Sequence, residues 1–213
     1  MSGVFVTLEG GEGTGKTTQA QRLAEHLERL GHRVRLTREP GGTALGRDLR
    51  RMLLEVREDP PCPRAELLLY GADRAQHVER LIRPALEAGE VVVCDRFTDA
   101  TEAYQGWGRG MPAEAVRAVN RMAAAGVVPD RTVVLDLDPE EGVARSLGRH
   151  GPQGAEVRFE REDLAFHRRV RQGYRAIAER EPGRVRLVDA SGSEDEVFER
   201  VWAAVADLFR GGD

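Results

Sequence analysis

The chain has 213 residues, a formal net charge of −4 and 40% hydrophobic residues. This length suits one α/β domain with a sizeable core, and the acidic balance argues against bulk electrostatic binding to nucleic acid or to an anionic membrane. The apolar runs are no longer than a strand, which argues against a membrane span, and the first begins by residue 4, which leaves no room for a signal peptide and favours the cytoplasm.

Short apolar runs alternate with helical patterns along the whole chain, which predicts a parallel sheet with helices on both faces. The expected strands are Val4–Leu8, Val34–Thr37, Val91–Cys94, Thr132–Leu137 and Val185–Val188. Helices are expected to begin near Lys16, Leu45, Arg64, Glu114, Glu140, Arg161 and Glu194. We therefore expect one α/β domain over residues 1–213, with a five-stranded parallel sheet sandwiched by helices.

A glycine-rich loop lies between the first expected strand and the first expected helix. It matches the phosphate-binding pattern G-x-x-x-x-G-K-[ST] without a mismatch and is formed by Gly10, Gly11, Glu12, Gly13, Thr14, Gly15, Lys16 and Thr17, followed by Thr18. The glycines let backbone N–H groups surround an anion, and the helix N-terminus adds partial positive charge. Lys16, the only lysine in the chain, is expected at the β- and γ-phosphates, and the Thr17 hydroxyl at Mg²⁺. The alternative is a simple glycine turn, but the flanking strand and helix favour binding of a nucleoside triphosphate.

Polar residues follow three of the expected strands. Glu9 precedes the loop, Arg38 begins the segment 38–43, and Asp95 and Arg96 follow the third strand. Ligands of parallel sheets lie beyond the carboxyl ends of the strands, so these side chains should face one crevice. Asp95 is placed to hold Mg²⁺ through water. Asp136 is a rival for that role, and a surface ion pair is the alternative for Asp95 and Arg96.

Two further regions offer groups for recognition. Tyr70, Arg74 and His77 lie on one face of one expected helix. That face either packs in the core or presents an aromatic ring and a guanidinium to a nucleobase, and the spacing does not decide between them. The segment 104–110 reads as a helix end entering a glycine-rich loop, where Gln105 offers both an amide donor and an acceptor.

Residues 148–158 have no apolar period and contain three glycines and a proline. This segment is expected to be a loop. Four arginines frame it, namely Arg145, Arg149, Arg158 and Arg161. The cluster is either a solvated surface or part of a closing lid, which we place at residues 148–160.

Taken together, these motifs resemble the thymidylate kinase family over essentially the whole chain. The resemblance rests on EGGEGTGKTTQ (9–19), REPGGT (38–43), DRF (95–97) with AYQGWGRG (103–110), and VRFERED (157–163). It implies a P-loop kinase fold with a short lid, phosphorylation of dTMP to dTDP by ATP with Mg²⁺, and a homodimer. It departs from the family pattern at Ala100, where serine is usual and Thr101 follows, and at Val157, where aspartate is common.

The resemblance also implies roles by position. Glu9 would hold the ribose 3′-hydroxyl, and Arg38, Arg50 and Arg96 would surround the 5′-phosphate. Tyr70 would stack on thymine, Arg74 would donate to O4, Gln105 would meet N3–H, and Tyr104 would close the ribose floor. Pro40 and Thr101 complete the expected substrate site. Lys16, Asp95, Arg96 and Arg158 form the expected catalytic set, and Thr17 and Asp95 the metal site. The loop from Gly10 to Lys16 contains no arginine, so Arg158 is expected to neutralise the transferred phosphoryl group, with Arg149 as the substitute.

Other nucleotide-binding classes fit less well. A GTPase would need an N-K-x-D motif, which is absent, and D-x-x-G occurs only at Asp189–Gly192. A P-loop ATPase module of a larger assembly would not need a second anion pocket. Another nucleoside monophosphate kinase is the nearest rival among enzymes.

Overall fold

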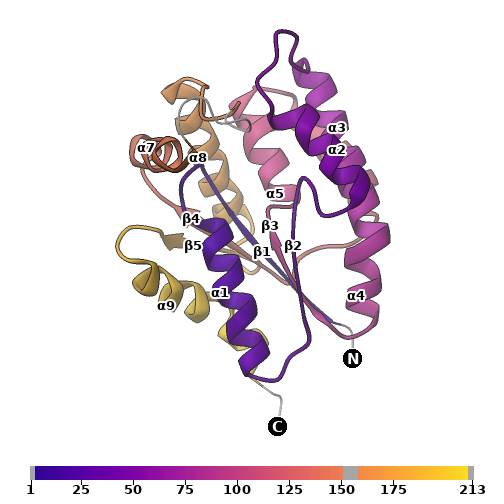
Figure 1. The fold of residues 1–213 in the computed structure, drawn as a ribbon, viewed down its shortest axis with the longest axis vertical. Helices are drawn as coiled ribbons and strands as arrows, with labels where there is room; N and C mark the ends of the chain where they lie inside the picture. The colour runs from indigo at the N-terminus through magenta and orange to yellow at the C-terminus, as the bar shows by residue number, and fades with distance from the viewer. Residues whose placement is uncertain (1–2, 151–157, 211–213) are drawn as a thin grey trace.

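The computed structural model describes residues 3–150 and 158–210. Within them, five strands form one sheet in the order β2-β3-β1-β4-β5 (Figure 1). The strands are β1 (Val4–Gly10), β2 (Val34–Arg38), β3 (Val91–Asp95), β4 (Arg131–Asp136) and β5 (Val185–Asp189). Every neighbouring pair is parallel, which confirms the predicted fold class.

All seven expected helices are present, and their starts lie within three residues of the prediction. They are α1 (Lys16–Arg29), α2 (Ala44–Leu54), α3 (Pro63–His77), α6 (Ala113–Ala124), α7 (Pro139–His150), α8 (Leu164–Arg180) and α9 (Glu194–Val205). The sequence pattern indicated only the end of the short helical piece η2 (Glu102–Gly108), and it did not indicate η1 (Val78–Ile82), α4 (Arg83–Glu87), α5 (Thr98–Thr101) and η3 (Ala206–Leu208). Pieces of this length carry too few turns to produce a helical period.

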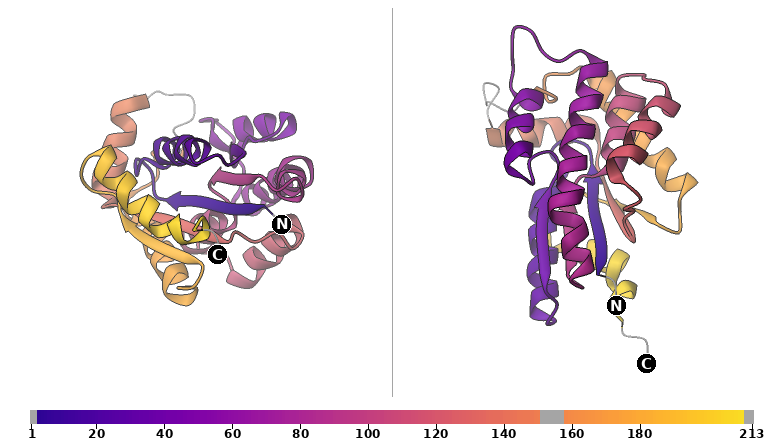
Figure 2. Two further views of the ribbon diagram at one scale, coloured as in Figure 1. Left: turned by 90° about the horizontal axis from the view of Figure 1, so that it is seen from below. Right: turned by 90° about the vertical axis from the view of Figure 1, so that its right-hand side faces the viewer.

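The sheet lies between two helical layers (Figures 1 and 2). Successive side chains of a strand point to opposite faces. Val91 and Val93 of β3 therefore pack in the core that α1 and α9 cover, whereas Val92 and Cys94 pack against η1 and α4 on the other face. Both faces being covered explains why the strands read as continuous apolar runs. No helix in the described ranges is long and apolar enough to cross a membrane.

Because all five strands run in one direction, their carboxyl ends meet at one edge of the sheet, the upper edge in Figure 1. The loop that follows β1 leads into α1 there, and the segments that follow β2 and β3 lie beside it. The sheet thus brings together segments that are far apart in the sequence.

Candidate functional site

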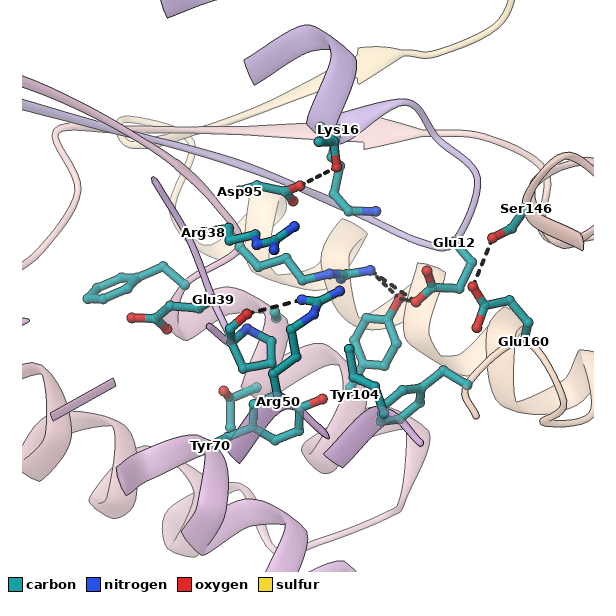
Figure 3. A pocket seen from close by; sticks show the side chains of 18 of the residues that line it. Glu12, Lys16, Arg38, Glu39, Arg50, Tyr70, Asp95, Tyr104, Ser146 and Glu160 are labelled. Atoms are coloured by element: carbon teal, nitrogen blue, oxygen red, sulfur yellow. Dashed lines mark hydrogen bonds and ion pairs between the residues drawn. The ribbon is translucent and has the colours of Figure 1, made fainter. Parts of the chain in front are cut away.

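A cavity of about 390 Å³ opens at the carboxyl edge of the sheet (Figure 3). It extends from the loop after β1, across the ends of β2 and β3, to helices α2 and α3 and the η2 turn. The predicted site residues that line it are Glu12, Gly13, Gly15, Lys16, Thr17, Arg38, Pro40, Arg50, Tyr70, Arg74, Asp95, Arg96, Thr101, Tyr104 and Gln105. One cavity therefore contains most of the residues that the sequence singled out.

The loop between β1 and α1 has the backbone that its glycines allow. Gly13 has φ 67°, and a Cβ there would lie 1.8 Å from the carbonyl oxygen of Gly142. Gly15 has φ 87° and caps α1. Lys16 begins the helix, and its Nζ donates to the carbonyl oxygen of Gly11 at 2.6 Å. The loop is thus shaped around its lysine, with the N-terminus of α1 behind it.

The charge of Lys16 depends on the groups around it. Burial lowers the pKa of Lys16 to about 8, and the nearby Arg96 acts in the same direction. The carboxylates of Glu12 and Asp95 oppose that shift. A phosphate group placed beside the amine would add negative charge and favour its protonated form.

Thr17 and Asp95, the predicted metal ligands, both line the cavity and contact each other. The Thr17 hydroxyl donates to Oδ2 of Asp95 at 2.6 Å. A hydroxyl and a carboxylate are the hard oxygen donors that Mg²⁺ prefers, and Mg²⁺ in phosphate sites commonly takes few protein ligands beside phosphate and water. The donor set fits the ion. The described residues contain no cluster of three or more His, Cys, Asp or Glu that would hold a metal by itself.

The rival carboxylate, Asp136, is engaged elsewhere. It accepts two hydrogen bonds from Arg171, at 2.7 and 2.9 Å, and one from Arg175 at 2.7 Å. Burial acts to raise the pKa of Asp136, but these two arginines lower it below its usual range. Asp136 does not line the main cavity. The geometry therefore supports Asp95 over Asp136 as the metal ligand.

Arg96 lines the cavity and contacts the glycine loop. Its φ of 71° is unusual for a residue with a side chain and is tolerated where the surroundings fix it. Its guanidinium donates to Gly10 O, to Glu12 Oε1 and to the Tyr104 hydroxyl, each at 3.0 Å. Burial acts to lower the pKa of Arg96, but Tyr104 and Glu12 raise it well above its usual value. Arg96 is therefore a permanent cation between the glycine loop and η2.

Glu12 is the acidic partner that the sequence did not predict for Arg96. The Tyr104 hydroxyl donates to Glu12 Oε1 at 2.7 Å, in addition to the contact with Arg96 (Figure 3). Burial acts to raise the pKa of Glu12, but Arg96, Lys16 and the Tyr104 hydrogen bond keep it below its usual range. Glu12 thus presents an ionised carboxylate to the cavity.

The segment after β2 is held against α3 by buried polar contacts. Oδ1 of Asp73 accepts from the Gly41 N–H at 3.1 Å. The ring of His77 contacts Thr37 Oγ1 at 2.7 Å and Glu39 Oε1 at 2.9 Å. His77 is fully buried and does not line the cavity, so it has the core-packing role that the sequence left open.

Arg38 and Arg50 carry two positive charges to the cavity from this side. Arg38 ends β2 and is exposed, and Arg50 comes from α2 and donates to the carbonyl oxygen of Pro40 at 3.0 Å. Arg96 lines the same cavity. Three guanidinium groups thus line the cavity together with Lys16, and Figure 3 shows Arg38 and Arg50 close to each other within it.

The far end of the cavity is lined by Tyr70, Arg74 and Gln105. Arg74 is only 1% exposed because its guanidinium is bound by Glu39, Asn120, the Phe97 carbonyl and the Thr101 hydroxyl. Ala100 lacks the hydroxyl of the serine that is usual there in the family. The neighbouring Thr101 has a hydroxyl, which accepts a hydrogen bond from Arg74. Gln105 is held by Glu66, to which its amide donates at 2.7 Å.

A family model described as thymidylate kinase matches residues 8–201. The chain belongs to the thymidylate kinase family. It is 55% identical to the thymidylate kinase of Solidesulfovibrio magneticus over 208 residues, which are 96% of this chain and 100% of that protein. It is 52% identical to that of Desulfosudis oleivorans over 205 residues, 95% of this chain and 96% of the relative.

A solved structure agrees with this assignment. The crystal structure of thymidylate kinase from Ehrlichia chaffeensis matches with a TM-score of 0.76 and 32% identity, covering 96% of this chain and 99% of the other. The family identifies the chain as a kinase, an ATP-dependent transferase acting on a nucleoside monophosphate. Membership in the thymidylate kinase family does not favour the ATPase module or another monophosphate kinase.

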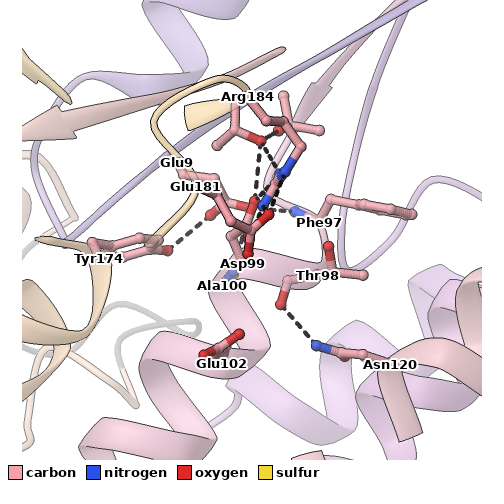
Figure 4. A network of polar contacts seen from close by, with 12 residues as sticks. Glu9, Phe97, Thr98, Asp99, Ala100, Glu102, Asn120, Tyr174, Glu181 and Arg184 are labelled. Carbon is pink, nitrogen blue, oxygen red and sulfur yellow. Dashed lines mark hydrogen bonds and ion pairs between the residues drawn. The ribbon is translucent and has the colours of Figure 1, made fainter. Parts of the chain in front are cut away.

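One residue implied by the resemblance to this family, Glu9, does not line the cavity. Its carboxylate is fully buried and accepts from the Phe97 N–H at 2.7 Å, the Ala100 N–H at 3.3 Å and the Tyr174 hydroxyl at 2.8 Å (Figure 4). The reason is that β1 continues to Gly10. Glu9 is therefore a strand residue that points into a helical layer, and burial, with nearby Asp99, raises its pKa to about 8.

Arg158 also lies away from the cavity. Its guanidinium donates to the Leu53 carbonyl at 2.8 Å and to Oε2 of Glu66. These two acceptors hold it behind α2, whereas Phe159 and Glu160 line the cavity in its place. Residues 151–157 of the expected lid, including Val157, and the side chain of Arg149 lie outside the described residues.

Proposed function

We propose that this chain transfers the γ-phosphoryl group of ATP to dTMP and releases dTDP and ADP. The observation that carries the proposal is that two cationic phosphate sites open into one cavity. Lys16 of the glycine loop forms one of them, and Arg38, Arg50 and Arg96, which line the same cavity, form the other. A hydrolase would need only the first site, whereas transfer between two phosphorylated molecules needs both.

The donor would lie in the loop from Gly10 to Thr18, with its phosphates on the backbone N–H groups and Lys16. Thr17 and Asp95 are the residues that would hold Mg²⁺. When bound, the ion would neutralise charge on the β- and γ-phosphate oxygens. Positioning and charge neutralisation supply most of the catalysis in reactions of this type.

The acceptor would place its 5′-phosphate among the three arginines, next to the γ-phosphate of ATP. Its base would lie beside Tyr70, Arg74 and Gln105. For the ribose 3′-hydroxyl, the geometry supports Glu12 instead of Glu9, because Glu12 presents its carboxylate to the cavity and Glu9 is sealed behind β1. The Tyr104 ring, which lies 4.8 Å below the Arg96 guanidinium, would form the floor.

Arg158 would act as the lid arginine only after its guanidinium leaves Glu66 and Leu53. We propose that this change accompanies binding of both substrates, because their phosphates create the negative charge that would attract it. The family resemblance further supports a homodimer and a role in dTTP synthesis in the cytoplasm.

The test is a panel of acceptors assayed with ATP and Mg²⁺. The enzyme alone should hydrolyse ATP slowly, and dTMP should speed ADP formation with one dTDP formed per ADP. The other deoxynucleoside and ribonucleoside monophosphates should be poor acceptors. ATP hydrolysis that is indifferent to every monophosphate would reject the proposal.

A further inference from the structure

Glu66 does not line the cavity, but it holds Gln105, which does. It belongs to the first turn of α3, and its side chain is completely buried. Its carboxylate accepts from the amide of Gln105 at 2.7 Å and from two nitrogens of Arg109, each at 3.3 Å. The guanidinium of Arg158 donates to it as well. A buried carboxylate is stable only with such partners.

These contacts determine how the amide of Gln105 is turned. Arg109 can only donate and it contacts both oxygens of Glu66, so both oxygens act as acceptors. The side chain of Gln105 must therefore direct its NH₂ group toward Glu66. Its carbonyl oxygen is left as an acceptor, and within the described residues no group donates to it. Gln105 lines the cavity, so this acceptor is available to a ligand there.

We propose that Glu66 is a positioning residue that sets the choice of pyrimidine by holding the Gln105 carbonyl toward the base. The inference rests on the proposed function. Thymine and uracil carry a hydrogen on N3 and match a carbonyl acceptor, whereas N3 of cytosine is itself an acceptor. An amide free to turn over would present NH₂ to cytosine as readily as it presents oxygen to thymine. Glu66 prevents that turn because it can accept only.

Glu66→Gln tests this idea with little change in volume. Oε2 of Glu66 accepts from both Arg109 and Arg158, whereas Oε1 accepts from Gln105 and from one nitrogen of Arg109. The new side chain should therefore keep its carbonyl at the position that the two arginines share and place its NH₂ at the position that Gln105 faces, where Arg109 loses only its Nε contact. Gln105 can meet that donor only with its carbonyl, which turns its amide over and places NH₂ in the cavity. One substitution outside the cavity wall would thus reverse the polarity of the group that meets the base.

The measurement is kcat/KM for dTMP, dUMP and dCMP. In E66Q the ratio of dTMP to dCMP should fall by about tenfold or more, as expected for one mismatched hydrogen bond in a buried site. The ratio of kcat/KM for dTMP to that for dUMP should stay within about twofold of its wild-type value, because the two bases differ only in the 5-methyl group and both carry a hydrogen on N3. Glu162→Gln is the matched control, since Glu162 also pairs with Arg109, at 2.6 Å, but among the described residues it has no hydrogen bond to Gln105, whose amide donates to Glu66. It should leave both ratios unchanged.

The outcomes separate this inference from the proposed function. If wild-type enzyme phosphorylates none of the three acceptors, the proposed function fails. If wild-type enzyme prefers dTMP and E66Q lowers all three values by one common factor, Glu66 only supports the fold and the inference is overturned. Should E66Q not fold, Glu66→Asp keeps the charge but withdraws the acceptor, and it should lower the ratio of dTMP to dCMP in the same direction. An unchanged ratio in folded E66D also overturns the inference.

Discussion

The hydroxyl of Thr17 and the carboxylate of Asp95 lie 2.6 Å apart, although 78 residues separate them in the chain. Pairing of β1 with β3 brings them together, because Leu8 is in register with Asp95. The hydroxyl donates this hydrogen bond and the carboxylate accepts it. Both residues line the cavity, so their oxygens are available to a cation that enters it.

Asp95→Asn should therefore raise the Mg²⁺ concentration that the enzyme requires. We expect the Mg²⁺ concentration for half-maximal rate to rise by about tenfold or more, because an amide is a poorer ligand than a carboxylate. Chelation with EDTA should abolish transfer in the wild type. Asp136→Asn is the control, since Asp136 is bound by Arg171 and Arg175. A shift in the Mg²⁺ requirement for D136N and none for D95N would move the metal site to Asp136.

The affinity for ATP should fall above about pH 8. The pKa of Lys16 is lowered to about 8 by burial, so its amine is charged below that pH and neutral above it. A bound phosphate favours the charged form of the Lys16 amine and so raises its pKa. Between the pKa of Lys16 in the free enzyme and its pKa in the ATP complex, each pH unit should lower the affinity for ATP by up to about tenfold. Titration with a fluorescent nucleotide would measure it. Lys16→Arg keeps its charge and should give a flat profile over the same range. A flat profile in the wild type would contradict the prediction.

Glu9 should make the fold less stable as pH rises. Its pKa is raised from 4.5 to about 8, so the folded state retains a proton that the unfolded chain loses between these values. The contribution of Glu9 to stability is thus fully present below about pH 4.5 and is lost as pH rises through 8, a change of a few kcal/mol. Chemical unfolding across this range should show a flatter pH profile for Glu9→Gln. Glu114→Gln, on the exposed side of α6, serves as the reference. Parallel profiles for wild type and E9Q would reject the assignment.

Arg158→Ala should slow phosphoryl transfer if the arginine leaves Glu66 to cover the transferred group. An arginine in that role is worth about 10³-fold or more in rate, and lysine should restore only part of it because it lacks the planar fork. Single-turnover kinetics at saturating substrates would show the loss, with dTMP affinity little changed. A loss under about tenfold would leave Arg158 with the role seen in this structure, as a partner of Glu66. A larger loss in Arg149→Ala would move the catalytic role to Arg149.

Local patterns were sufficient to predict the sheet, the phosphate-binding loop and the residues at the ends of the strands. A loop motif depends on neighbours in sequence, and a strand buried on both faces shows itself as an apolar run. Asp95 and Arg96 could be placed in the cavity for the same reason, since parallel strands end at one edge.

Local patterns could not predict which of Glu9 and Glu12 faces the cavity. Both flank the same loop, and only the extent of β1 decides that Glu9 points into a helical layer while Glu12 faces the cavity. Strand ends are set by pairing with other strands, so a local pattern does not specify them.

Glu66 and Arg158 depend still more on tertiary structure. On its own helix Glu66 looks like any surface glutamate, and its partner Gln105 lies 39 residues away and Arg158 92 residues away. The sequence by itself determined the fold class, the phosphate-binding chemistry and the residue types of the site, because these follow from local periodicity and motif spacing. Only the tertiary structure decided which carboxylate faces the cavity and which way the Gln105 amide is turned, because hydrogen bonds between distant segments fix the orientation of buried polar groups.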